Sequence, residues 1–103
     1  MPQKIYANTS VEVTDLGYLV NLSDWKKEMA IEIAMENHLE LTDTHFAMLE
    51  YIRNEYIQGR NLTIRAIGKS GIVDIKGFYE LFPGGPLKLS SKIAGIPKPS
   101  SCT

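Results

Sequence analysis

The chain has 103 residues, 44% of them hydrophobic, and a formal net charge of −1, which is typical of one domain with a small core and gives no global electrostatic case for DNA binding. No apolar run approaches about 18 residues, and no basic segment precedes an apolar one near the start, so neither a membrane span nor a signal peptide is expected. A single cysteine without a disulfide framework is typical of a reducing compartment, so we expect a cytoplasmic protein.

The first twenty residues predict β-structure. Residues 11–13 alternate apolar and polar side chains, and residues 18–20 follow after a four-residue link. The link contains Asp15 and Gly17, which are typical of hairpin connections. We therefore expect an N-terminal hairpin between these two segments, to which residues 5–6 could add a short strand.

Apolar residues then recur every three or four positions, as in helices that bury one face. Ser23 is the expected N-cap of a first helix, which ends at residues 37–38. Thr42 and Asp43 begin a second helix, which ends at Gly59.

Two shorter helices are expected next. Asn61 can cap a helix over residues 62–69, and Asp74 can cap another over residues 75–82. The sequence therefore predicts a mainly α (α+β) fold, which is a small helical bundle with an N-terminal β-hairpin.

The sequence changes character after residue 82. Residues 83–86 are Pro-Gly-Gly-Pro, a strong breaker of regular structure, although residues 87–94 could form a short helix. We divide the chain into a helical body, residues 1–82, and a flexible C-terminal arm, residues 83–103.

Glycines and prolines determine the expected behaviour of this arm. Gly84, Gly85 and Gly95 can act as hinges, whereas Pro97 and Pro99 favour an extended chain. The eight residues 95–102 could extend about 26 Å, which is enough to enter a cleft of another protein.

The arm is basic and carries the only thiol. Lys88, Lys92 and Lys98 lie in it, and no acidic side chain follows Glu80. The lysines either solubilise the arm or dock it on an acidic partner. Cys102 has no second cysteine for a disulfide or a multi-cysteine metal site, so it is either an exposed sulfur on a movable tether or an accident of the sequence.

Other polar residues allow more than one interpretation. Arg65 and Lys69 lie four residues apart, on one face of the predicted third helix. They form either a solvated face or an anion-binding and partner-docking patch, which Arg53 and Arg60 could extend. His38 and His45 flank a helix–helix turn without further ligands, so we expect no metal.

No known catalytic triad, phosphate loop or carboxylate pair is present, and no cofactor is expected.

Several segments resemble the DsrC/TusE family of small sulfur-relay proteins. In the arm these are residues 81–86, residues 92–99 and Cys102. In the body, the resemblance extends over the following segments and residues: 15–19 with Trp25, 41–42 with His45, 52–56, and the pair Arg65 and Lys69. It therefore covers nearly the whole chain.

The resemblance implies that Cys102 carries sulfur as a persulfide. In TusE-like members, a TusBCD/DsrEFH-like complex donates the sulfur and a tRNA 2-thiouridylase accepts it. In DsrC proper, the protein is a partner of dissimilatory sulfite reductase and uses a second arm cysteine. That position is Ser91 here.

Because one cysteine cannot form a disulfide within the arm, the sequence favours a TusE-like sulfurtransferase, most simply for synthesis of wobble 2-thiouridine in tRNA. Two alternatives stay open. The first is a DsrC-like gamma-subunit role with sulfite reductase, and the second is a regulatory module of the sulfur pathway that moves no sulfur.

Overall fold

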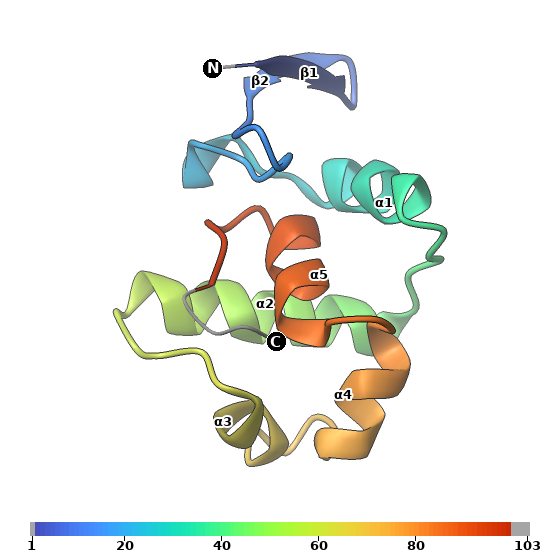
Figure 1. Ribbon diagram of the computed structural model, residues 1–103, viewed down its shortest axis with the longest axis vertical. Helices are drawn as coiled ribbons and strands as arrows, with labels where there is room; N and C mark the ends of the chain where they lie inside the picture. Colours follow the sequence, from blue (N-terminus) through green and yellow to red (C-terminus); the bar gives the residue numbers. More distant parts are fainter. Residues whose placement is uncertain (1, 100–103) are drawn as a thin grey trace.

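The computed structural model describes residues 2–99 and contains a two-stranded hairpin followed by helices (Figure 1). Strands β1 (Gln3–Tyr6) and β2 (Thr9–Glu12) are antiparallel. A short 3₁₀ turn, η1 (Leu22–Asp24), precedes the helices, which are α1 (Lys27–Glu36), α2 (Asp43–Ile57), α3 (Ile64–Gly68), α4 (Ile75–Leu81) and α5 (Pro86–Ile93). The predicted mainly helical fold with an N-terminal hairpin is confirmed. Among the described residues, no helix has the length and apolar character needed to cross a membrane.

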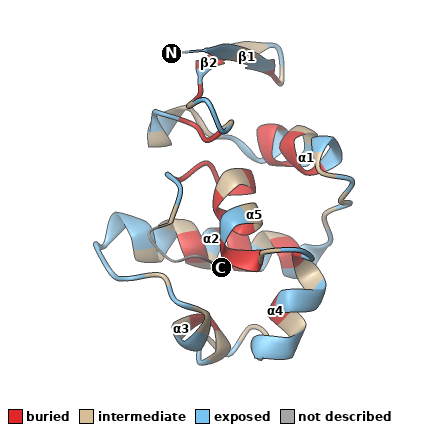
Figure 2. Cartoon of the chain, viewed as in Figure 1, coloured by how far each residue is buried: buried red, intermediate tan, exposed pale blue. Residues whose placement is uncertain are grey.

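Helix α5 occupies the middle of the molecule and packs against α1, α2 and α4 (Figure 1). Figure 2 shows that the buried residues gather on the helix faces that surround it. Each large apolar side chain buried there stabilises the fold by about 1.5–3 kcal/mol relative to an exposed one. The core that contains the buried residues of α5 also includes Met29 and Ile33 of α1, Leu49 and Ile52 of α2, and Phe78 of α4.

The central position of α5 changes the extent of the predicted arm. Residues 83–103 were expected to form an arm, yet Leu87, Ile93 and Ile96 are at most 1% exposed. The Pro-Gly-Gly-Pro segment does separate α4 from the next helix. Pro86 then stands in the first turn of α5, where a missing N–H costs nothing. Of the described residues, those that can belong to an arm are therefore 97–99.

The hairpin forms nearer the N-terminus than predicted, between residues 3–6 and residues 9–12. Tyr6 pairs with Thr9 across a tight turn at Ala7 and Asn8, both with positive φ, as a two-residue hairpin turn requires. The predicted pairing of residues 11–13 with residues 18–20 is reduced to one bridge between Val13 and Leu19.

Two glutamates of α1 anchor this hairpin. Glu32 accepts a hydrogen bond from the backbone N–H of Ala7 at 2.5 Å, and Glu36 accepts one from the Tyr6 hydroxyl at 2.7 Å. Glu36 also forms an ion pair with Lys4 at 2.9 Å. Partial burial raises the pKa of Glu36, but the bonds from Lys4 and Tyr6 outweigh it, so the net shift is downward.

The capping predictions are confirmed at two helices and wrong at two. Thr42 and Asp74 cap α2 and α4 through side-chain bonds to backbone N–H groups, as expected. The N-cap of helix α3 is Thr63 instead of Asn61. The N-cap of helix α1 is Lys26 instead of Ser23, because residues 22–24 form a 3₁₀ turn and Trp25 is extended.

Candidate functional site

The turn after α5 determines where the C-terminal segment leaves the body. Gly95 adopts a φ of +71°, and its N–H donates to the Lys92 carbonyl at 3.2 Å. The N–H of Ile96 donates to the Ser91 carbonyl at 3.1 Å. These two bonds form a Schellman motif, which ends a helix in a defined direction and satisfies its last carbonyls.

Two side chains from distant parts of the chain hold this turn. The indole Nε1 of Trp25 donates to the Ile93 carbonyl at 2.8 Å, and Arg53 Nη1 donates to the Ala94 carbonyl at 2.8 Å. Arg53 Nη2 also donates to the Leu22 carbonyl at 3.1 Å. Burial lowers the pKa of the Arg53 guanidinium, which nevertheless stays charged. Arg53 thus binds backbone inside the protein and does not extend a surface patch.

Gly95 is also sterically fixed. A Cβ atom there would lie 2.3 Å from Cδ1 of the Trp25 ring, so only glycine fits against the indole. This close packing favours a rigid turn over the predicted hinge. Gly85 is the N-cap of α5, and Gly84 is exposed. The hinge roles of Gly84 and Gly85 stay predictions.

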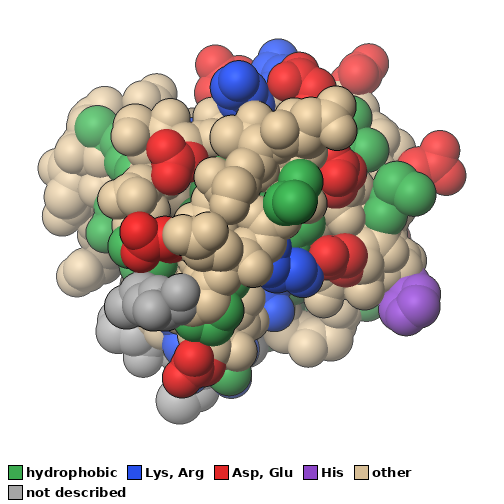
Figure 3. All heavy atoms as spheres, turned by 90° about the horizontal axis from the view of Figure 1, so that it is seen from above, with side chains coloured by type: hydrophobic (Ala, Val, Ile, Leu, Met, Phe, Trp, Pro, Cys, Tyr) green, Lys and Arg blue, Asp and Glu red, His purple; other side chains and the backbone are tan. Residues whose placement is uncertain are grey.

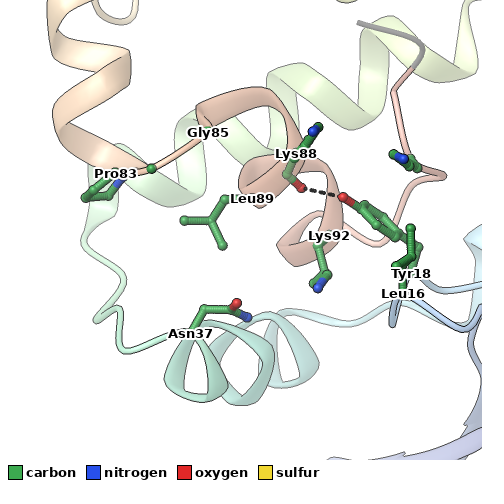
Figure 4. Close-up of a pocket in the computed structure, with 10 residues that line it drawn as sticks. Leu16, Tyr18, Asn37, Pro83, Gly85, Lys88, Leu89 and Lys92 are labelled. Atoms are coloured by element: carbon green, nitrogen blue, oxygen red, sulfur yellow. Dashed lines mark hydrogen bonds between the residues drawn. The ribbon is translucent and has the colours of Figure 1, made fainter. Parts of the chain in front are cut away.

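The three lysines predicted for docking line one groove, which we call the lysine groove (Figure 4). It measures about 490 Å³ and lies between α5 and the end of α1, where Asn37 faces Leu89 and Lys92. Two predicted hinge glycines border it. The complete lining is Leu16, Tyr18, Asn37, Pro83, Gly84, Gly85, Lys88, Leu89, Lys92 and Lys98.

Tyr18 forms one wall of the lysine groove. Its hydroxyl donates to the Lys88 carbonyl at 3.3 Å, and the Lys92 ammonium lies 5.3 Å from the centre of its ring (Figure 4). That distance is within the range of a cation–π interaction. Burial raises the pKa of the Tyr18 phenol, so Tyr18 is neutral at physiological pH.

The predicted pair Arg65 and Lys69 lies elsewhere. Both side chains are exposed on α3 and border a shallow hollow with Asp74 and Lys76. Helix α3 lies on the side of the molecule opposite the hairpin (Figure 1). The structure therefore brings Lys88, Lys92 and Lys98 together but keeps Arg65 and Lys69 apart from them. Arg60 binds Gln58 and Glu55 near the end of α2.

His45 has a structural role. Its Nδ1 accepts the backbone N–H of Thr42 at 3.0 Å, so Nε2 must carry the proton that it donates to the Leu81 carbonyl at 2.8 Å. His45 thus links the start of α2 to the end of α4. His38, after α1, is exposed with a φ of 59°. Within residues 2–99 there is no cluster of three or more His, Cys, Asp or Glu side chains that could hold a metal.

Sequence reasoning gave no site role to five residues of the lysine groove, which are Leu16, Tyr18, Asn37, Pro83 and Leu89. Residues 15–18 were interpreted as a hairpin link and strand and as part of the family resemblance, and that resemblance was the usable signal. Cys102, the predicted sulfur carrier, lies outside the described residues.

Comparison with known proteins agrees with the sequence analysis. Residues 5–103 match the family model described as DsrC like protein. The chain is 38% identical to the sulfurtransferase TusE of Buchnera aphidicola subsp. Schizaphis graminum, with 97% of this chain and 93% of the relative covered.

Two solved structures share the fold. The NMR structure of Allochromatium vinosum DsrC has a TM-score of 0.82 at 33% identity, covering 98% of this chain and 97% of that one. The oxidized gamma-subunit of dissimilatory sulfite reductase (DsrC) from Archaeoglobus fulgidus has a TM-score of 0.83 at 27% identity, covering 99% of this chain and all of that one. The chain belongs to the DsrC-like protein family.

Proposed function

We propose that this protein is a cytoplasmic sulfur carrier that accepts sulfur on Cys102 and passes it to an acceptor protein. The observation that carries the proposal is that a member of this family, related to a named sulfurtransferase, has a single cysteine in its whole sequence. The proposed donor is a TusBCD/DsrEFH-like complex. The proposed acceptor is a tRNA 2-thiouridylase-like enzyme, so that the sulfur ends in wobble 2-thiouridine.

The proposed chemistry is two successive displacements at one sulfur atom. The Cys102 thiolate attacks the outer sulfur of a donor persulfide, forming a new S–S bond while the donor cysteine leaves as a thiolate. An acceptor thiolate then attacks the outer sulfur on Cys102, and Cys102 leaves as a thiolate. Each step exchanges one S–S bond for another, so no external oxidant or reductant is needed.

The thiolate needs help to form, because a free cysteine has a pKa of about 8.5. Lys98, four residues away in the sequence, favours the anion modestly. We propose that the larger part of the activation takes place in the pocket of the partner.

Delivery is supported by the fixed turn at Gly95. Ile96 is the last strongly buried residue of the described chain, and the six residues from there to Cys102 can span up to about 20 Å. Pro97 and Pro99 restrict that segment, which lowers the entropy lost when it enters a cleft. A rigid base and a short tether fit a thiol that must meet a donor and an acceptor in turn.

A role beside sulfite reductase is the second candidate, because a structural relative is a gamma-subunit of that enzyme. The alternative of a two-cysteine mechanism is disfavoured by Ser91, which is fully buried in α5. A single cysteine can hold sulfur and pass it on, but it cannot release it by closing a disulfide within the chain.

The proposal is tested by intact-mass spectrometry after incubation with a cysteine desulfurase, cysteine and a TusBCD-type complex. We expect a gain of one sulfur, about 32 Da, that reductant reverses. Cys102→Ser should gain nothing. A matched variant, Ser101→Cys with Cys102→Ser, keeps one thiol but moves it by one residue, and it reports how strictly the position matters. Absence of any sulfur gain despite binding would favour the regulatory module.

A further inference from the structure

We propose that the lysine groove is the docking site for an acidic, partly apolar peptide segment of a protein partner. The sulfur-relay identity of that partner rests on the proposed function, whereas binding in the groove does not. The occupant would place carboxylates against Lys88, Lys92 and Lys98, one apolar side chain against Leu89 and another against Leu16.

The charge of the groove supports an anionic occupant. Three ammonium groups line it, and none of its lining residues is acidic. The ion pairs among the described residues are Lys4 with Glu36 and Arg60 with Glu55, and neither includes a groove lysine. Like charges gathered around one hollow repel one another, and a carboxylate-bearing ligand would relieve that repulsion.

The apolar part of the groove supports a peptide over a simple anion. Leu16 is 58% exposed, and exposed Pro83 and partly buried Leu89 also line the groove, with Leu16 and Pro83 at opposite ends of it (Figure 4). An apolar surface ringed by charged side chains is typical of a protein-binding site. A phosphate or sulfate ion would leave these side chains unused.

The groove is also preorganised. Lys88, Leu89 and Lys92 stand on α5, which is fixed in the core. The ring of Tyr18 limits where the Lys92 ammonium can move, because the two groups lie 5.3 Å apart. Side chains already held in place lose less entropy when a ligand binds.

A protein partner is favoured over RNA. The chain has a net charge of −1, and acidic side chains are spread over the hairpin end of the molecule (Figure 3). Three lysines alone would neutralise few phosphates, which makes for weak RNA binding at physiological salt. The one aromatic ring of the groove, Tyr18, is only 4% exposed and cannot serve as a stacking platform for bases.

The position of Lys98 links docking to delivery. Lys98 borders the lysine groove and also a second hollow formed with Tyr56, Arg60 and Pro97. It precedes Cys102 by four residues. A segment bound to Lys98 would therefore hold the thiol within a short tether of the partner and raise its effective concentration there.

The test is an NMR titration of the ¹⁵N-labelled full chain with three probes. These are a peptide of alternating Glu and Leu, a peptide of alternating Gln and Leu of equal length, and a single-stranded oligouridylate. We expect the acidic peptide to shift the amides of Leu16, Tyr18, Asn37, Gly85 and Leu89. The neutral peptide and the RNA should bind at least about tenfold more weakly.

A matched pair of charge reversals makes the test specific. Lys88→Glu with Lys98→Glu changes two exposed groove lysines and should weaken peptide binding at least about tenfold. Lys69→Glu with Lys76→Glu makes the same change in charge at two exposed lysines beside α3, and it should retain most of the affinity.

The proposal is overturned if the shifts map to α3, if the two double variants lose affinity equally, or if RNA binds the groove better than the acidic peptide. It is also overturned if Lys88→Glu alone, without any probe, shifts the amides of residues 100–103, because the occupant would then be the chain's own end. Cys102→Ser should lose the sulfur gain yet keep peptide binding. Failure of the carrier function and failure of the docking site are therefore distinguishable.

Discussion

The guanidinium of Arg53 stacks on the indole of Trp25, with 4.3 Å between its carbon and the ring centre. Both side chains donate to carbonyls at the end of α5, those of Ile93 and Ala94. Two residues that lie 68 and 41 positions before their partners in the sequence thus hold the turn from which the C-terminal segment departs.

Arg53→Ala should lower the free energy of unfolding by about 2–3 kcal/mol, because it removes a partly buried stacking contact and two charge-assisted hydrogen bonds. Arg53→Lys should recover little of this loss, since an ammonium cannot reach two carbonyls in a fork. Urea denaturation measures the change.

Arg60→Ala is the control, because Arg60 is exposed and pairs with Glu55 at 3.3 Å near the end of α2. It should cost no more than about 0.5 kcal/mol. Equal losses for the two arginine variants would show that the contacts around Trp25 contribute nothing to stability.

Gly95→Ala should be far more costly than Gly59→Ala. Both glycines have a positive φ, +71° and +76°, so the backbone penalty for alanine is similar, about 1–2 kcal/mol. Only Gly95 meets an obstacle, because its new Cβ would lie 2.3 Å from the Trp25 ring, whereas Gly59 has nothing within 4 Å.

The difference in unfolding free energy between these two variants isolates the steric part. We expect it to exceed about 1 kcal/mol, as is usual for overpacking. A change in the tryptophan fluorescence of Gly95→Ala should accompany it. If both variants lose the same stability, Gly95 has room to move and the predicted hinge role would be restored.

The elements predicted correctly have local signals. Thr42 and Asp74 stand three residues before the N–H groups that they cap, so a short window of sequence contains the whole interaction. Gly59 ends α2 by its own backbone conformation. Such features do not depend on the rest of the fold.

The elements predicted wrongly depend on distant residues. A short helix over residues 87–94 was allowed, but nothing near Leu87 shows that this helix, α5, lies in the core between α1, α2 and α4, and its flanking prolines and glycines favour an arm. The turn at Ala7 is supported by Glu32, 25 residues away. The lysine groove likewise joins Tyr18 to Lys88 across 70 positions. The three lysines of the candidate site could therefore be predicted from the sequence, but the groove that they form with distant residues could not.

Ser91→Ala should be neutral or stabilising, by up to about 1 kcal/mol, because the Ser91 hydroxyl is buried without a hydrogen-bond partner among the described residues. Ser90→Ala is the matched control in the next position of α5. The Ser90 hydroxyl is equally buried but donates to the Leu87 carbonyl at 3.3 Å, so its removal should not stabilise. Thermal unfolding distinguishes the two, and a larger loss for Ser91→Ala would reveal a hidden partner of its hydroxyl.

The burial of Ser91 also predicts how slowly a cysteine at this position, in Ser91→Cys, would react. It places a second cysteine where the family resemblance implies one for DsrC proper, but the new thiol would replace a side chain of α5 that is 0% exposed. We expect one thiol to react quickly with a disulfide reagent and the second only as fast as the helix opens. Two equally fast thiols would mean that α5 leaves the core readily, which would favour the arm boundary first predicted at residue 83.

Tyr18 should make stability depend on alkaline pH. Burial raises the pKa of its phenol in the folded protein above the unfolded value of about 10. The stabilisation is therefore complete below pH 10 and is lost as the pH rises through the folded pKa, because the unfolded chain ionises first. Burial also raises the pKa of Tyr6, so Tyr18→Phe should remove only part of the loss of stability at alkaline pH.

The measurement is urea denaturation of both proteins between about pH 9 and pH 11, within the range where tyrosine ionises. Below that range, Tyr18→Phe should cost about 1 kcal/mol, the usual value of one hydrogen bond, here the bond to the Lys88 carbonyl. Its stability should then fall less steeply than that of the parent, so the two curves approach each other as the pH rises. Parallel curves would mean that the Tyr18 phenol titrates normally, and the wall of the lysine groove would then be open to water.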